Sequence, residues 1–166
     1  MQLTQAAAEK KMADMNMGDL PLVQIMPKKS HVASDWFVQY KNLRRRFMES
    51  LEDSIQELAF LNLSRDEFMN LITGRDLPTN LSLRWRIPLT WGGDLTIENM
   101  FMCRTFPHSQ NMDRFIMEQD GFDTIWMPNP AKKIYLPIID ATGGAGGNAT
   151  EDRLTQMAAM NRGMDI

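Results

Sequence analysis

The side chains best suited to chemistry lie close together in the second half of this 166-residue chain. Asp94, Glu98 and His108 offer two carboxylates and an imidazole, a set that could hold a Mg²⁺ ion, in part through water. Arg84 and Arg86 lie two residues apart on a predicted strand, so their side chains project from the same face. Both guanidinium groups could therefore bind the phosphates of a nucleic acid. Each group also has a structural interpretation: the arginines can pair with local carboxylates, and His108 can be a core residue on a helix face.

Residues 74–108 carry a family resemblance that includes several of these positions. Ile87-Pro88-Leu89 ends the first predicted strand, Gly92-Gly93 forms a turn, Asn99 follows, and His108 lies just inside a predicted helix. This order resembles the HNH (ββα-metal) nuclease module, in the form found in bacterial toxin domains. The resemblance implies two antiparallel strands and a helix around a divalent metal ion. In the family, two adjacent histidines supply a metal ligand and the general base, the last histidine completes the metal site, and the asparagine steadies the loop.

The sequence departs from the family at the double histidine, where it has Arg84-Trp85. A guanidinium is permanently charged and has no lone pair to offer a cation. An indole has no titratable group and cannot act as a general base near neutral pH. The loss of both groups removes the machinery for metal-assisted hydrolysis, whereas the ββα shape can persist.

We therefore interpret the chain as a catalytically degenerate HNH-like domain, without a cofactor, that acts as a macromolecular interaction or assembly protein. On this interpretation Gly92, Gly93 and Asn99 are structural. Arg84 and Arg86 are the candidate nucleic-acid-binding residues. The expected partner is another protein or a second copy of the chain, with nucleic acid as the alternative.

Two other hypotheses remain open. The first is an active metal-dependent nuclease with a displaced site, in which Asp94, Glu98 and His108 hold Mg²⁺ and His108 is catalytic. It predicts that the carboxylates lie within about 5 Å of the imidazole. The second is a structural component of a phage or of a secretion apparatus, with an accidental resemblance to nucleases. A nucleophilic pair of Cys103 and His108 would need a short contact that spacing cannot establish.

The helices that precede this stretch can be predicted from periodicity. Apolar residues recur at three- and four-residue steps over residues 36–61, which predicts one long amphipathic helix. Ser64 and Glu67 form a capping box. A short helix is therefore expected over residues 65–73, with Gly74 as its left-handed terminator.

The period changes to two over residues 83–89, which predicts a strand with one buried face. A second strand is predicted over residues 99–103, followed by a helix from Pro107 to about Gln119. Two apolar stretches between residues 124 and 139 flank Pro128-Asn129-Pro130, which predicts a hairpin. The predicted fold class is α+β: a long helix and a short helix packed on a ββα unit, followed by a β-hairpin.

Composition divides the chain into three parts. Residues 1–33 are predicted to form a mobile arm, residues 34–140 a compact α+β domain, and residues 141–166 a glycine-rich linker with a short helix. The extended segment over residues 20–26 could lie along a sheet edge or a partner. Two groups of methionines in the terminal parts could dock on a partner: Met12, Met15 and Met17, and Met157, Met160 and Met164.

Composition and charge limit the class of protein. The net charge is −3, so binding of nucleic acid needs a local basic patch. The single cysteine, Cys103, excludes an intrachain disulfide and a multi-cysteine zinc site, and it is typical of a reducing compartment. No stretch approaches the roughly 20 apolar residues of a membrane span, and residues 1–17 lack the apolar segment of an export signal. We therefore expect a cytoplasmic protein, with signal-less secretion or a place in a phage particle as alternatives.

Overall fold

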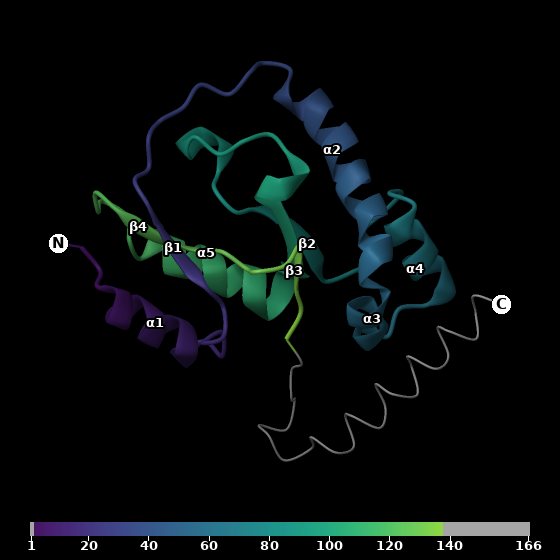
Figure 1. The fold of residues 1–166 in the computed structure, drawn as a ribbon, viewed down its shortest axis with the longest axis horizontal. Helices are drawn as coiled ribbons and strands as arrows, with labels where there is room; N and C mark the ends of the chain where they lie inside the picture. Colours follow the sequence, from purple (N-terminus) through teal and green to yellow (C-terminus); the bar gives the residue numbers. More distant parts are fainter. Residues whose placement is uncertain (1, 138–166) are drawn as a thin grey trace, which may run out of the picture. The chain divides into compact units, whose positions relative to one another are not determined.

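The fold is α+β, as the periodicity predicts, in a computed structural model that describes residues 2–137 (Figure 1). The predicted linker and helix over residues 141–166, with their methionines, lie outside the described residues. The chain divides into two compact units where the sequence predicted one domain. The first unit combines Met1–Arg44 with Asn80–Tyr135, and the second begins with Arg45–Thr79.

Short helices and strands follow one another along the described part of the chain (Figure 1). The α-helices are α1 (Gln5–Asp14), α2 (Trp36–Ser50), α3 (Ile55–Leu58), α4 (Arg65–Ile72) and α5 (Gln110–Met117). The strands are β1 (Leu22–Ile25), β2 (Leu81–Trp85), β3 (Met100–Arg104), β4 (Ile125–Pro128) and β5 (Ile134–Tyr135). An irregular turn over Thr105–Ser109 leads into α5. Within residues 2–137, no helix is both long and apolar enough to cross a bilayer.

Two small sheets form the β part of the first unit. β2 and β3 pair antiparallel, with Leu81 opposite Arg104 and Trp85 opposite Met100, and α5 follows β3 along the chain. β5 joins β3 in parallel, which gives the order β2-β3-β5. β1 pairs antiparallel with β4 in a separate sheet. The extended segment over residues 20–26 therefore lies along a strand of its own chain.

The hairpin predicted between residues 124 and 139 does not form. Its two stretches become β4 and β5, which pair with β1 and β3 instead of with each other. Pro128 ends β4 opposite Leu22, and neither Pro128 nor Pro130 has an N–H to donate to a ladder between the two stretches. The loop between β4 and β5 is held by other contacts: the Asn129 N–H donates to the Pro21 carbonyl at 2.8 Å, and Arg86 donates to the Pro130 carbonyl.

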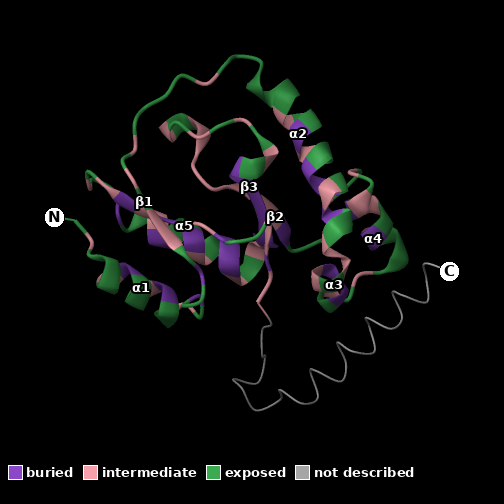
Figure 2. Ribbon diagram, in the orientation of Figure 1, coloured by how far each residue is buried: buried purple, intermediate pink, exposed green. Residues whose placement is uncertain are grey.

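The core of the first unit includes N-terminal side chains, which corrects the prediction of an arm over residues 1–33. Figure 2 marks buried stretches of the ribbon on α1, β3 and α5. Their side chains form one cluster with others of the N-terminal segment, which includes Ala8, Met12, Met17, Leu20, Phe101, Cys103, Met112 and Phe115. Ala8 and Met12 are one helical turn apart on α1, so a short helix buries both although its apolar pattern is weak. Met15 packs partly buried against the same cluster. The N-terminal methionines therefore fill core space, as flexible thioethers do, and are not a free docking surface.

The second unit begins within α2. The single long helix predicted over residues 36–61 does not form, because it is interrupted after the end of α2. A 3-10 turn over Leu51–Ser54 follows α2, and α3 is only one turn long. Ser54 has φ −119° and ψ 31°, outside the helical range. Serine and aspartate side chains compete for backbone hydrogen bonds, which lowers their helix propensity. Burial nevertheless follows the predicted apolar spacing, and Leu51 and Leu58 are fully buried.

The capping box at the start of α4 is confirmed. The Glu67 N–H donates to Ser64 Oγ at 3.1 Å, and the Ser64 N–H donates to Glu67 Oε1 at 3.2 Å. Gly74 follows the helix with φ +74°, as a left-handed terminator requires. A Cβ on Gly74 would also lie 2.9 Å from the Arg45 carbonyl oxygen, so glycine is needed there for space as well.

Candidate functional site

The loop that joins β2 to β3 is closed by the side chain of Asn99. Asn99 Oδ1 accepts from the Ile87 N–H at 3.0 Å, and Asn99 Nδ2 donates to the carbonyls of Ile87 and Asp94, each at 2.9 Å. Gly92 has φ +94°, and a Cβ on Gly93 would lie 1.9 Å from the Ile87 carbonyl oxygen. The structural role expected of Gly92, Gly93 and Asn99 thus has a direct geometric basis: the two glycines let the chain turn and approach closely, and the amide holds the turn shut.

Arg84 links β2 to the beginning of α5. Its Nη1 donates to Asp113 Oδ1 at 2.7 Å, to Ser109 Oγ at 2.9 Å and to the Ser109 carbonyl at 3.3 Å. The Arg84 side chain is 15% exposed, whereas that of Asp113 is 63% exposed. Arg84 Nε is buried and has no hydrogen-bond partner within the described residues. A fixed guanidinium therefore occupies the position at which the family resemblance implies a metal ligand, and its charge repels a cation.

Arg86 fastens the loop before β5 to the hairpin. Its Nε donates to the Glu98 carbonyl at 3.1 Å. Its Nη1 donates to Asn129 Oδ1 at 3.2 Å and to the Pro130 carbonyl, and its Nη2 donates to the Lys132 carbonyl at 3.0 Å. Both arginines that were candidates for phosphate binding thus direct donors to acceptors of their own chain. Of the two interpretations that the sequence left open, the geometry favours local partners.

His108 lies in a buried position just before α5. The residue is 3% exposed, and its ring lies 5.5 Å from the Tyr135 ring in an edge-on arrangement. His108 Nδ1 is buried and has no hydrogen-bond partner within the described residues. Burial, helped by the positive charge of Arg104 and opposed by Asp19, lowers the pKa of His108 to about 4. The imidazole is therefore neutral at physiological pH, and its surroundings are those of a core histidine.

The structure does not bring Asp94, Glu98 and His108 together as a metal site. Among residues 2–137, no group of three or more His, Cys, Asp or Glu side chains could hold a metal ion. Asp94 and Glu98 are exposed on the hairpin loop, whereas His108 is buried against the ring of Tyr135. The hypothesis of a displaced Mg²⁺ site therefore lacks the ligand set that it proposed.

Cys103 is a fully buried residue of β3. Burial raises the pKa of its thiol to about 11, although the charge of Arg84 and a hydrogen bond with Ser109 act in the opposite direction. A thiol that stays protonated at neutral pH is a poor nucleophile. The burial of Cys103 and the raised pKa of its thiol therefore give no support to a nucleophilic pair of Cys103 and His108.

A pocket of about 330 Å³ lies beside Arg84 and Trp85. Side chains of β2, the hairpin loop, α5 and β4 line it: Leu83, Arg84, Trp85, Pro88, Trp91, Asp113, Ile116 and Met127. Outside the pocket, the Trp85 ring lies 5.7 Å from the Tyr40 ring of α2, and Tyr40 lies 6.0 Å from Trp36. The pocket is mainly apolar and aromatic, with one ion pair in its wall, and it suits a flat apolar group better than a hydrated metal ion.

Sequence reasoning missed most of this pocket. The sequence patterns do not single out Trp91, Ile116 or Met127, which lie beside the predicted turn, within the predicted helix and within a predicted strand. The lining comes from four segments, and no local signal in the sequence shows that α5 and β4 lie beside β2 and the hairpin loop. The adjacent Arg84-Trp85 pair was the one sequence feature that marked the place.

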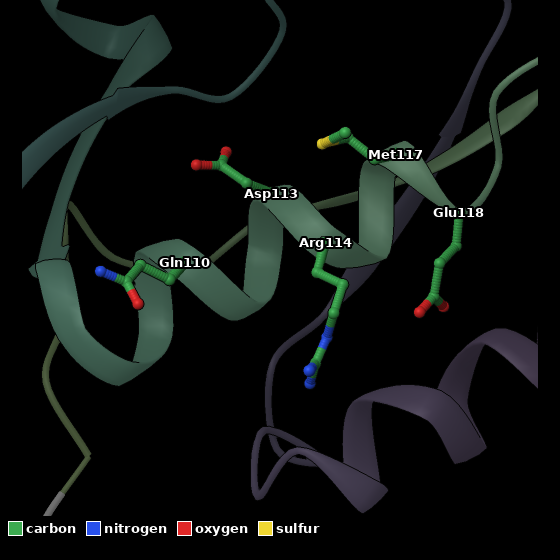
Figure 3. Close-up of a pocket in the computed structure, with 5 residues that line it drawn as sticks. All are labelled: Gln110, Asp113, Arg114, Met117 and Glu118. Atoms are coloured by element: carbon green, nitrogen blue, oxygen red, sulfur yellow. The ribbon is translucent and has the colours of Figure 1, made fainter.

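A second, open depression of about 540 Å³ lies on the outer face of α5 (Figure 3). It is lined by Gln110, Asp113, Arg114, Met117 and Glu118. All five residues are exposed, and Glu118 pairs with Lys11 of α1 at 2.9 Å. Because no polar group is held in a buried, preorganised position there, the depression does not specify a ligand.

The resemblance to HNH nucleases rests on residues 74–108 alone. Neither a protein-family model nor a curated protein nor a solved structure matches the chain. The function must therefore be inferred from the contacts of the site itself.

Proposed function

We propose that this chain is a non-catalytic, macromolecule-binding protein built on an HNH-like ββα frame. Support for the frame comes from the antiparallel pairing of β2 with β3 and from the helix α5 that follows them. It also comes from Asn99, whose three side-chain hydrogen bonds steady the loop as the family's asparagine does. The proposal retains this frame and assigns no hydrolysis to it.

The observation that carries the proposal is the use of Arg84 and Trp85. The Arg84 guanidinium is tied to Asp113 and Ser109, and the Trp85 ring packs near Tyr40. Neither side chain can ligate a cation or accept a proton near neutral pH. A frame whose chemical positions are filled by structural contacts favours binding over catalysis.

The pocket beside these two residues is the part of the frame best suited to a partner. Trp85 and Trp91 supply aromatic walls, and the Arg84 guanidinium in the wall is held by Asp113 and Ser109. Tryptophan is among the residue types that most often carry binding energy at interfaces. A volume of about 330 Å³ is at the lower end of the range for small-molecule sites. It suits one inserted group of a macromolecule better than a whole cofactor.

A cleavage assay tests the proposal. Supercoiled DNA and RNA are incubated with the full chain and Mg²⁺, Mn²⁺, Ni²⁺ or Zn²⁺ in turn, beside the variants His108→Ala and His31→Ala. His31 is exposed and serves as the matched histidine control. We expect no cleavage by any of the three proteins. Robust cleavage that His108→Ala abolishes and His31→Ala retains would overturn the proposal.

A further inference from the structure

Positive charge is concentrated in one segment of this acidic chain. Between residues 20 and 48 the sequence has one acidic side chain, Asp35, and six basic ones, although the net charge of the chain is −3. The six basic residues are Lys28, Lys29, Lys41, Arg44, Arg45 and Arg46. Four of these, up to Arg44, belong to the first compact unit. This segment is therefore locally basic, although the chain as a whole is acidic.

The three lysines of this segment are available at the surface. Lys28, Lys29 and Lys41 are all exposed. None of them takes part in the ion pairs found within residues 2–137. The Lys41 ammonium instead lies 4.9 Å from the centroid of the Phe37 ring. Unlike Arg84 and Arg86, these cations can therefore meet an external anion.

Exposed aromatic side chains lie near Lys41 at the beginning of α2. Trp36 is 37% exposed, Phe37 52% and Val38 71%. The Trp36 and Phe37 rings lie 5.7 Å apart, edge to face. Lys41 follows Phe37 by four residues, so a cation and a ring share one helix face. Large apolar groups gathered at a surface mark an interaction site more often than single exposed ones do.

The segment that carries Lys28 and Lys29 is held beside the hairpin loop. It runs from β1 to α2 (Figure 1). The Ser30 N–H donates to the Thr90 carbonyl at 2.8 Å, and a Cβ on Gly92 would lie 3.5 Å from Ser30 Oγ. The other end of the segment is anchored through the Tyr40 ring near Trp85 of β2. Both ends are thus fixed within the first unit.

We propose that Lys28, Lys29, Trp36, Phe37 and Lys41 form a basic–aromatic surface that binds single-stranded nucleic acid. This inference rests on one part of the proposed function, the binding of a macromolecule, and it names the partner class. Lysine ammonium groups contact phosphates without a fixed geometry. Exposed rings stack on unpaired bases whatever their sequence, whereas the bases of a duplex are already stacked on one another. The surface lies outside residues 74–108 and does not depend on the HNH resemblance.

Fluorescence anisotropy of a labelled oligothymidylate of about 20 nucleotides, titrated with the full chain, measures this binding. We expect the affinity to fall as salt rises, with a log–log slope of about −2 for three lysine–phosphate contacts. A duplex of the same length should bind more weakly. The variant Lys28→Glu/Lys29→Glu should raise the Kd about tenfold or more. Phe37→Ala, at an exposed position, should raise it about fivefold through lost stacking.

The charge control is Lys10→Glu/Lys11→Glu, which makes the same change of charge on α1, where these lysines pair with Asp14 and Glu118, and it should shift the Kd by less than about twofold. Circular dichroism establishes that each variant is folded. The inference is overturned if the strand does not bind at low salt, or if both double variants lose affinity equally. Binding to vesicles of anionic phospholipid without binding to the oligonucleotide would also overturn it. If neither binding nor cleavage is found, the inference fails while the proposed function stands; cleavage lost in His108→Ala would instead overturn the proposed function.

Discussion

The hairpin–helix region and the segment over residues 28–44 use their basic side chains in opposite ways. Arg84 and Arg86, in the hairpin, donate to carboxylate, hydroxyl, amide and carbonyl oxygens of their own chain. Lys28 and Lys29 are exposed and take part in none of the ion pairs found within residues 2–137. Because the hydrogen bonds of both arginines go to acceptors of their own chain, these side chains stabilise the fold, and the lysines are left for a ligand. The role of a basic residue thus depends on acceptors that only the fold brings to it.

The largest effect is expected where the hairpin loop closes. Gly93→Ala would put a Cβ 1.9 Å from the Ile87 carbonyl oxygen, a backbone atom that cannot move aside cheaply. We expect the free energy of unfolding to fall by about 4 kcal/mol or more, measured by urea denaturation. Gly121→Ala is the control, because Gly121 has φ +86° but no atom within 4 Å of the added Cβ. It should cost about 1 kcal/mol, and equal losses in the two variants would contradict a tightly closed loop.

The next effect concerns pH. The pKa of His108 is lowered to about 4 in the folded protein, against about 6.5 in the unfolded chain. The unfolded chain therefore binds the proton more readily than the folded protein. The contribution of the neutral His108 to the free energy of unfolding is fully present above a pH of about 6.5, and it is lost as the pH falls towards about 4. We expect this residue to account for about 2–3 kcal/mol of the loss over that window.

Urea denaturation at a series of pH values isolates the contribution of His108. The variant His108→Gln should lose less stability than the wild type between neutral pH and a pH of about 4. The variant His31→Gln, at an exposed position, should follow the wild-type curve. If His108→Gln keeps the full pH dependence, the buried imidazole is not the group responsible.

A smaller loss is expected when the link between β2 and α5 is cut. Arg84→Met removes the donors to Asp113 and Ser109, and it should lower the free energy of unfolding by about 2 kcal/mol. Asp113→Asn, at a side chain that is 63% exposed, should cost less than about 1 kcal/mol. Thermal unfolding followed by circular dichroism gives both values. An unchanged midpoint for Arg84→Met would show that this guanidinium is not a structural element.

The smallest effect on stability should come from the lysines. Lys28→Ala/Lys29→Ala should change the free energy of unfolding by less than about 0.5 kcal/mol, since both side chains are exposed. The same variant should weaken the binding of oligothymidylate. A loss of stability as large as that of Arg84→Met would show that these lysines also stabilise the fold, which contradicts the difference between the two regions.

Local signals were sufficient for several elements of the fold. Ser64 and Glu67 are three residues apart, so the capping box and the helix it opens follow from neighbouring residues. The two-residue alternation before the loop and the turn at Gly92-Gly93 likewise predicted a strand and its reversal. Their boundaries differ by a few residues from the predicted ones, because strand ends depend on the partner strand as well as on the pattern.

The remaining features depend on partners distant in sequence. β4 and β5 were expected to pair with each other, but the edges they meet belong to β1 and β3. The apolar pattern of α1 was too weak to predict that the helix is buried. The side chains that cover Ala8 and Met12 come from β3 and α5, which are distant in sequence. Arg84 has the residue type of a phosphate ligand, and its actual partner, Asp113, is 29 residues away. Neither periodicity nor spacing identifies such partners.

Calorimetric titration of the full chain with Mn²⁺ and Zn²⁺ tests most directly whether the hairpin–helix region still supports metal chemistry. Beside the wild type, the variants His108→Ala and His31→Ala are titrated in the same buffer. The account predicts that the three proteins give the same heats, with no binding event that depends on His108. One-to-one binding that persists in His31→Ala and disappears in His108→Ala would contradict it.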